Sequence, residues 1–207
     1  MNYFKERDFF HEGMRHFQDF FDGRKTAEAI EKNRKHYEFW DDEKDLIENS
    51  KFFFIASSWN GYIDCNIKSG DSGFVKIIDS DTIEYPEYDG NSMYRTAGNI
   101  SKNPNVGLLF INFDGKSRRI RINGHATIHH DINIVNNHYG AKFVVRIKCE
   151  IFPNCPRYIP NLETNAPSVY VPRKGQGIPP APEWKHRDYI KNILPEGDPH
   201  KEEKETP

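Results

Sequence analysis

The sequence is poor in several features that would assign it to a familiar class of protein. It has three cysteines in 207 residues, Cys65, Cys149 and Cys155, and an odd number without paired spacing argues against a disulfide framework. We therefore expect reduced thiols in a cytoplasmic protein. No apolar run approaches the roughly 20 residues of a membrane-spanning helix. The first residues, MNYFKERDFFHEG, carry charges among their aromatics, which is not typical of a signal peptide.

The sequence also lacks an excess of charge of one sign. Its 29 basic and 31 acidic residues give a net charge of −2, so there is no overall basic surface of the kind that binds nucleic acid. We expect neither a nucleic-acid nor a membrane partner. The hydrophobic fraction is low at 36%, but 14% of the residues are aromatic, which predicts a core filled by large side chains.

The common catalytic and nucleotide-binding motifs are missing too. The sequence has no G-x-S-x-G, no P-loop and no G-x-G-x-x-G that leads into a helix. Cys149 and Cys155 do not have the spacing of zinc ligands. His125 and His129 lie in a strand pattern, where four residues span about 13 Å, so we expect exposed strand histidines and no metal site.

The sequence does contain a helical segment at its start. Residues 1–50 predict an N-terminal helical extension in which the first helix ends at Gly23 and the second covers residues 26–40. A third helix is expected to begin at the acidic residues 41–43, because a helix dipole favours negative charge there. Phe17, Phe20 and Phe21 are spaced to share one face of the first helix. Leu46 and Ile47 of the third helix are expected to face the core.

Residues 51–153 predict a series of short strands. The runs FFFIASS and YIDCNI flank Trp59-Asn60-Gly61, which is a strong hairpin signal. The runs GFVKII and TIEY form a second expected hairpin, and VGLLFINF, RRIRINGHATI and KFVVRIKCEIF follow. Many short strands with Gly-containing turns predict an antiparallel barrel or sandwich. Residues 154–207, rich in Pro and Gly, predict a C-terminal arm with a short helix near residues 184–193 and a disordered tail.

One polar segment, DGNSMYRTAGNISKNP, predicts a short helix between two strands. Asn91 or Ser92 would be its N-cap. Arg95 and Thr96 would then lie in the first turn, where free N–H groups and the helix dipole favour an anion. A guanidinium and a hydroxyl suit phosphate, and Lys68, at the end of the second strand, adds a cation. From the residues alone, a phosphate site competes with a surface arginine and a solvated lysine.

The order of these motifs resembles that of the pyridoxamine 5′-phosphate oxidase-like family of FMN-binding split barrels. The resemblance is carried by FFFIASSWNGYIDCNIKSGDSGFV, then YPEYDGNSMYRTAGNISKNPNVGLLFINF, then RRIRINGHATI. The segments FPNCPRYIP and VPRKGQGIPPAPEWKHRDYIKNILPEGDP are similar to a bacterial pyridoxamine 5′-phosphate oxidase-related subgroup, so the resemblance spans residues 10 to 200. It implies a mainly β fold with added helices, a six-stranded antiparallel split β-barrel over residues 51–153. It also implies a homodimer with FMN at the subunit interface.

The resemblance further implies which residues contact FMN: a phosphate-binding pair at the helix start, a polar residue facing the flavin ring, the end of the second strand, and a basic strand. Arg95 and Thr96 match the phosphate-binding pair, and Asn99 matches the polar residue that faces the flavin ring. Asn66, Lys68 and Ser69 match the end of the second strand, and Arg119 and Arg121 match the basic strand. The family's oxidases often have lysine where Thr96 stands, so Thr96 implies a less positive phosphate site. The tail around Trp184 and Arg187 departs from the oxidases' closing motif, which argues against pyridoxamine phosphate as the substrate.

The resemblance implies an FMN-dependent oxidoreductase that acts on a small molecule. A flavin carries the hydride and one-electron chemistry itself, so no side chain needs to be a nucleophile or a general base. A positive group near flavin N1 and O2 would stabilise the reduced anion, and Lys68 or Arg121 could supply it. Two alternatives remain open: a flavin-binding or flavin-storing protein without turnover, such as one that acts in redox stress, or a split barrel that binds a deazaflavin or haem.

Overall fold

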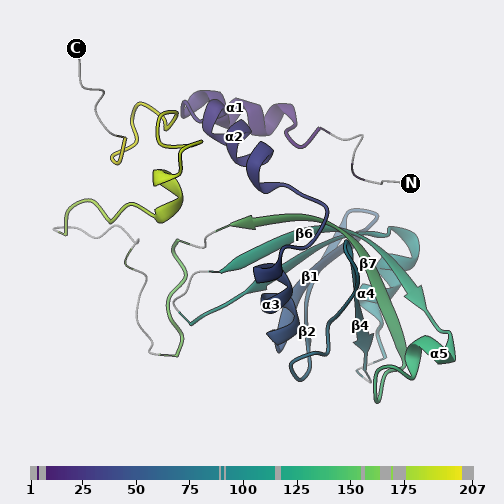
Figure 1. The fold of residues 1–207 in the computed structure, drawn as a ribbon. Helices are drawn as coiled ribbons and strands as arrows, with labels where there is room; N and C mark the ends of the chain where they lie inside the picture. The colour runs from purple at the N-terminus through teal and green to yellow at the C-terminus, as the bar shows by residue number, and fades with distance from the viewer. Residues whose placement is uncertain are drawn as a thin grey trace, which may run out of the picture. The chain divides into compact units, whose positions relative to one another are not determined.

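The computed structural model describes residues 4, 8–88, 90, 92–114, 118–154, 157–163, 169 and 176–201 (Figure 1). The chain divides into two compact units. One consists of His36–Asn112 and Arg118–Cys155, and the other of Met1–Lys35, Phe113–Ser117 and Pro156–Pro207. Among the described residues, no helix combines the length and the apolar character that crossing a membrane requires.

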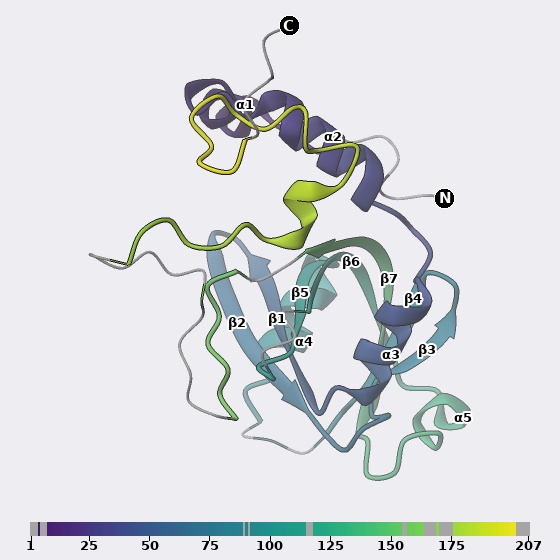
Figure 2. The same ribbon diagram turned by 60° about the vertical axis from the view of Figure 1, so that its left-hand side comes forward.

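The first unit is built on one sheet of seven strands in the order β2-β1-β5-β6-β7-β4-β3, and every neighbouring pair is antiparallel. The strands are β1 Phe52–Trp59, β2 Tyr62–Ser69, β3 Lys76–Asp79, β4 Thr82–Glu87, β5 Asn105–Ile111, β6 Arg119–His129 and β7 Phe143–Asn154. The sheet curves strongly, as Figures 1 and 2 show. The predicted mainly β, antiparallel fold is confirmed. The sheet has one strand more than the six that the resemblance implies, because both runs of the predicted second hairpin form strands and the first of them is the four-residue β3 at the sheet edge.

The first predicted hairpin is confirmed at its turn. Trp59 pairs with Tyr62, so only two residues connect β1 and β2. Both connecting residues have positive φ angles, 49° for Asn60 and 81° for Gly61. An Asn-Gly pair tolerates this left-handed backbone, and the resulting turn matches the twist of the flanking strands.

The core of this unit is aromatic, as the composition predicts. Phe53 is fully buried on β1, and its ring lies 4.9 Å from that of Phe110, 5.1 Å from Tyr85 and 6.0 Å from Phe74. The N-terminal aromatics behave differently. The side chains of Phe17, Phe20 and Phe21 are exposed, so they are not part of this core.

The helices lie where the sequence predicts them, but some of their ends differ from the prediction. The short helix α5 is not predicted. The helices are α1 Glu12–Phe20, α2 Arg24–Arg34, α3 Asp41–Asn49, α4 Arg95–Lys102, α5 Ile132–Val135 and a 3₁₀ turn, η1, at Glu183–His186. The first helix ends at Phe20, three residues before the predicted Gly23; the Gly23 N–H still donates to the Gln18 carbonyl at 2.6 Å, and Gly23 is also the N-cap of α2. The second helix stops well before residue 40, because His36 already forms a bridge to Ile151 on β7. Leu46 and Ile47 of α3 are buried, as predicted.

The second unit joins the N-terminal helices to the C-terminal arm. The Thr26 hydroxyl of α2 donates to the carbonyl of Ile193 at 2.6 Å, and Ile190 and Leu194 are buried. Figure 2 shows this segment, in yellow, beside α1 and α2. The helix predicted near residues 184–193 is reduced to η1, which is followed by turns. The tail predicted to be disordered falls largely on residues 202–207, outside the described residues.

Candidate functional site

The helix α4 begins at Arg95, which places Arg95 and Thr96 in its first turn, as predicted. Its N-cap is Tyr94, whose backbone is left-handed (φ 49°, ψ 35°) and whose side chain makes no capping hydrogen bond. The prediction of Ser92 as the cap is therefore wrong, and Asn91 lies outside the described residues. The helix start thus lacks the side-chain acceptor that usually satisfies the first N–H groups, a geometry that suits an anion.

Three polar side chains of β2 share one face of that strand, and two of them, Asp64 and Asn66, contact this helix start. Asp64, Asn66 and Lys68 alternate along the strand, so they share one face of the sheet. That face is the inner one, because their register partners on β1 are Ser57, Ile55 and Phe53, all buried.

Hydrogen bonds join this strand to α4. The Asn66 amide donates to the Thr96 hydroxyl at 3.3 Å, and that hydroxyl donates to Asp64 Oδ2 at 3.3 Å. The guanidinium of Arg95 pairs with the other oxygen of the same carboxylate, Oδ1, at 3.1 Å. The structure therefore brings together Asn66, Arg95 and Thr96, three of the predicted site residues. We call Asp64, Asn66, Lys68, Arg95 and Thr96 the cradle.

Each cation of the cradle already has an anionic partner. Asp64 pairs with Arg95, and the Lys68 ammonium lies 2.5 Å from Glu87 Oε1 on β4. Tyr85, two residues before Glu87, is fully buried, and burial together with the nearby Glu87 charge raises the pKa of its hydroxyl. The formal charges cancel within each of these two pairs.

Asn99 lies one turn beyond Arg95 on α4. Its amide donates to the hydroxyl of Ser57 on β1 at 3.1 Å, and Ser57 is 3% exposed. Asn103, just after α4, donates to the carbonyl of Ser58 at 3.1 Å. These two bonds fasten both turns of α4 to β1 and so fix the helix start next to β2.

Two predicted site residues lie on the other face of the sheet. Ser69 follows Lys68 on β2, so its side chain points the opposite way. Arg121 is in register with Leu109 and Phe152, and its guanidinium lies 5.3 Å from the Phe152 ring. Burial lowers the pKa of this arginine. Within one chain, the structure does not bring Ser69 or Arg121 to the cradle, and their contact with FMN stays a prediction.

Arg119 lies two residues before Arg121 on the same strand, so it faces the same way. Its Nε donates to the Asn154 side chain at 2.7 Å, and the two residues are register partners on β6 and β7. It therefore has a structural partner on β7, and its contact with FMN stays a prediction.

Sequence reasoning missed Asp64 and Glu87. A signal was present for Asp64, because polar residues recur at every second position of a strand whose inner face should be apolar. Such alternation of Asp64, Asn66 and Lys68 indicates a polar site on the inner face. For Glu87 no comparable local pattern exists, since its partner Lys68 comes from another strand.

The cradle residues fit a phosphate in the kind of groups they offer. A guanidinium, a hydroxyl and a side-chain amide meet at an uncapped helix start, and the Lys68 ammonium lies further along the same face of β2; all of these can donate to phosphate oxygens. The carboxylates of Asp64 and Glu87 are the groups that oppose an anion.

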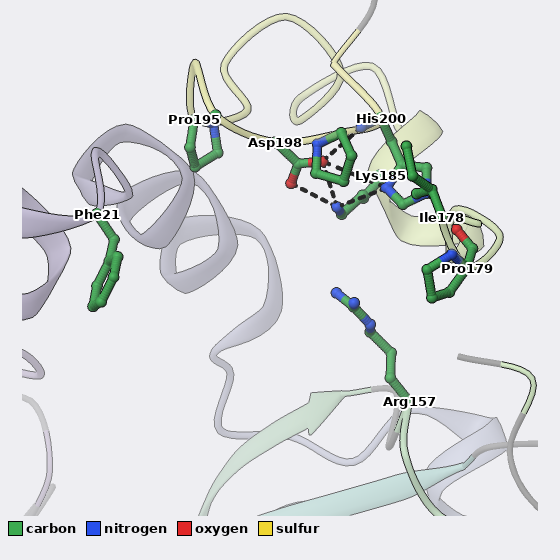
Figure 3. A pocket seen from close by; sticks show the side chains of 10 residues that line it. Phe21, Arg157, Ile178, Pro179, Lys185, Pro195, Asp198 and His200 are labelled. Carbon is green, nitrogen blue, oxygen red and sulfur yellow. Dashed lines mark hydrogen bonds and ion pairs between the residues drawn. The ribbon is translucent and has the colours of Figure 1, made fainter. Parts of the chain in front are cut away.

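A cavity of about 420 Å³ lies in the other unit (Figure 3). Its most buried polar group is Lys185, whose ammonium bonds both Asp198 oxygens at 2.5 and 2.6 Å and contacts His200 Nδ1 at 3.2 Å. His200 Nε2 lies 2.7 Å from the Pro179 carbonyl. Arg157 points toward this network in Figure 3. Because these groups satisfy one another, we assign them the structural role of holding the C-terminal arm together.

Comparison with known protein families matches residues 39–154 to pyridoxamine 5′-phosphate oxidase, which is more than half of the 207 residues. The chain belongs to this family. The matched range takes in all seven strands and α4, so the whole cradle lies within the family's domain. The fold is the split barrel that the resemblance implies, with one strand more than expected.

Solved structures of limited similarity accompany this family match. A tagged form of the protein HupZ from Group A Streptococcus is 21% identical, with a TM-score of 0.46, and the alignment covers 63% of this chain and 98% of that one. An FMN-binding protein of Syntrophomonas wolfei is 15% identical, with a TM-score of 0.41 and coverage of 68% and 96%. A search of curated proteins finds no match.

Proposed function

We propose that this chain is an FMN-binding flavoprotein that acts as an oxidoreductase on a small molecule. The observation that carries the proposal is the hydrogen-bonded junction of β2 with the start of α4, where Asn66, Thr96 and Arg95 meet. Membership of the pyridoxamine 5′-phosphate oxidase family supports it, because the junction falls in the matched range.

The four cradle residues other than Asp64 have roles in this proposal. Arg95, Thr96 and the first N–H groups of α4 would hold the phosphate, and Asn66 would orient the Thr96 hydroxyl. Lys68 would place positive charge near the flavin ring, where such charge stabilises a reduced flavin. Bound FMN would supply the hydride and one-electron chemistry. The protein would bind it, orient it and exclude water.

We also propose that two copies of the chain associate. The outward face of β2 exposes Ile63 and Ile67, and the register places Phe54 of β1 and Leu109 of β5 on the same face. Exposed apolar surface of this kind is typical of an interface. Arg121 lies on this face as well. Association through it would therefore place Arg121 at the interface, where the resemblance puts the cofactor. A cytoplasmic location is part of the same proposal.

The test is to purify the full chain and to identify its bound ligand by absorbance and mass. A yellow protein with stoichiometric FMN supports the proposal. A colourless protein that ignores added FMN, or one that retains a deazaflavin or haem, overturns it. Anaerobic mixing with NAD(P)H or with pyridoxamine phosphate then tests turnover. If no donor in a broad panel bleaches the bound flavin, the flavin-storage alternative replaces the oxidoreductase.

A further inference from the structure

Both cations of the cradle are paired with carboxylates of the same chain. We propose that Asp64 sets the charge selectivity of this site by competing with the ligand's phosphate for Arg95 and Thr96. The proposal rests on the flavin site described above and deepens it. The cradle would then bind a phosphorylated flavin only slightly more tightly than a flavin without a phosphate.

The competition follows from the bonds that Asp64 makes. One carboxylate oxygen accepts from Arg95 at 3.1 Å and the other from Thr96 at 3.3 Å. These are the same two donors that a phosphate at the helix start would use. A ligand phosphate must therefore share these donors with Asp64 or replace it.

The backbone on both sides of this contact is held in place, whereas the Arg95 side chain itself is 58% exposed. Asp64 is 8% exposed and lies within β2, in register with buried Ser57. Asn99 and Asn103 fasten α4 to β1. A phosphate that enters the cradle would consequently lie close to the Asp64 carboxylate. Like charges at such short range repel strongly in a partly desolvated site, because solvent screens them weakly there.

The remaining cation does not offset this repulsion. The Lys68 ammonium is 2.5 Å from Glu87, and both side chains are largely buried. The four charged groups sum to zero, whereas a phosphate monoester carries about −1.5 to −2 at neutral pH. Replacing Asp64 with asparagine removes one negative charge and keeps the shape and one oxygen acceptor. The loss of charge should therefore outweigh any loss of positioning.

The experiment compares FMN and riboflavin, which differ by the phosphate, in calorimetric titrations of the ligand-free full chain. We expect the unmodified chain to bind the two within about threefold of each other. Asp64→Asn should bind FMN at least about tenfold more tightly and riboflavin unchanged. Asp42→Asn, which removes the same charge from the exposed face of α3, should behave as the unmodified chain.

Two further variants keep the inference open to refutation. Adding Arg95→Ala to Asp64→Asn should abolish the gain for FMN. If thermal melting shows that Asp64→Asn is unfolded, Asp64→Thr is tested in its place, because threonine favours the strand conformation. Folded Asp64 variants that bind FMN no more tightly than the unmodified chain overturn the inference while the flavin proposal stands.

If no form of the chain binds either flavin, the flavin proposal fails on its own account. Inorganic phosphate then decides the role of Asp64, with the Arg95 side-chain NMR signal as the readout. Tighter phosphate binding in Asp64→Asn supports the inference, and equal or weaker binding overturns it.

Discussion

At the residue scale, Arg95 is the side chain on which the proposed phosphate site depends most directly. Replacing Arg95 with alanine should weaken FMN binding by about 1.5–3 kcal/mol, the range of a hydrogen bond to a charged group. The variant also leaves the Asp64 carboxylate without its cationic partner, which acts in the same direction. Fluorescence titration measures the dissociation constant. Lys102→Ala, in the last turn of the same helix, is the control and should change little. An unchanged constant for Arg95→Ala contradicts the assigned role.

Glu84 shows how a buried carboxylate makes stability depend on pH. It is 3% exposed and bonds Arg146 Nε at 2.9 Å and His138 Nε2 at 3.1 Å. Burial alone would raise the pKa of Glu84, but the hydrogen bonds from Arg146 and His138 lower it below its ordinary value of 4.5. A lowered pKa means that the ionised carboxylate stabilises the folded state above this ordinary value. That stabilisation is lost as the pH falls through the lowered pKa.

We therefore expect Glu84→Gln to lower the free energy of unfolding by about 1–3 kcal/mol at neutral pH. The difference from the unmodified chain should shrink in acid, once Glu84 of the unmodified chain is itself protonated. Urea denaturation at several pH values measures both effects. Glu48→Gln, at an exposed position of α3, should have little effect at any pH. A deficit that stays constant into strong acid would show that the ionised carboxylate is not responsible.

At the element scale, two glycines in regular structure should respond to alanine in opposite ways. A Cβ on Gly124 of β6 would contact Val106 Cγ2 at 2.9 Å and would also clash with Ile147. Gly124→Ala should therefore cost about 1–3 kcal/mol through overpacking. Gly98 of α4 is exposed and has open space at the same position, so Gly98→Ala should stabilise by about 0.5–1 kcal/mol. Thermal melting of both variants measures the signs, and equal signs would refute the packing argument.

The elements that could be predicted are those whose signals are local. The Asn60-Gly61 turn and the presence of Arg95 and Thr96 in the first turn of α4 follow from residues next to each other in the sequence. The left-handed cap at Tyr94 could not be predicted, because tyrosine has no preference for positive φ. The pairing of Asp64 with Arg95 could not be predicted either, because it depends on how α4 lies across β2. Sequence reasoning therefore identified the cations of the site and missed the anions that balance them.

At the scale of the whole molecule, we expect a dimer formed through the outward face of β1, β2 and β5. Ile67→Lys places a charge on that face and should halve the mass measured by light scattering, because burying an unpaired charge is unfavourable. If the cofactor site includes residues of the second copy, loss of the dimer should also weaken FMN binding. Ile132→Lys, at an exposed position of α5, is the matched control and should remain a dimer. An unmodified chain that is monomeric and still binds FMN contradicts this assembly.

The two described cysteines differ in a way that makes the proposed assembly accessible to labelling. Cys65 is exposed on the outward face of β2, whereas Cys149 is 1% exposed on the inner face of β7, where burial raises its thiol pKa. Since the thiolate is the reactive form, a maleimide reagent should spare Cys149 in any state of assembly. Cys65 lies on the proposed interface between Ile63 and Ile67, so association of two copies should shield it. With Cys155 replaced by serine, Cys65 should therefore react slowly in the dimer and faster in the monomeric Ile67→Lys variant.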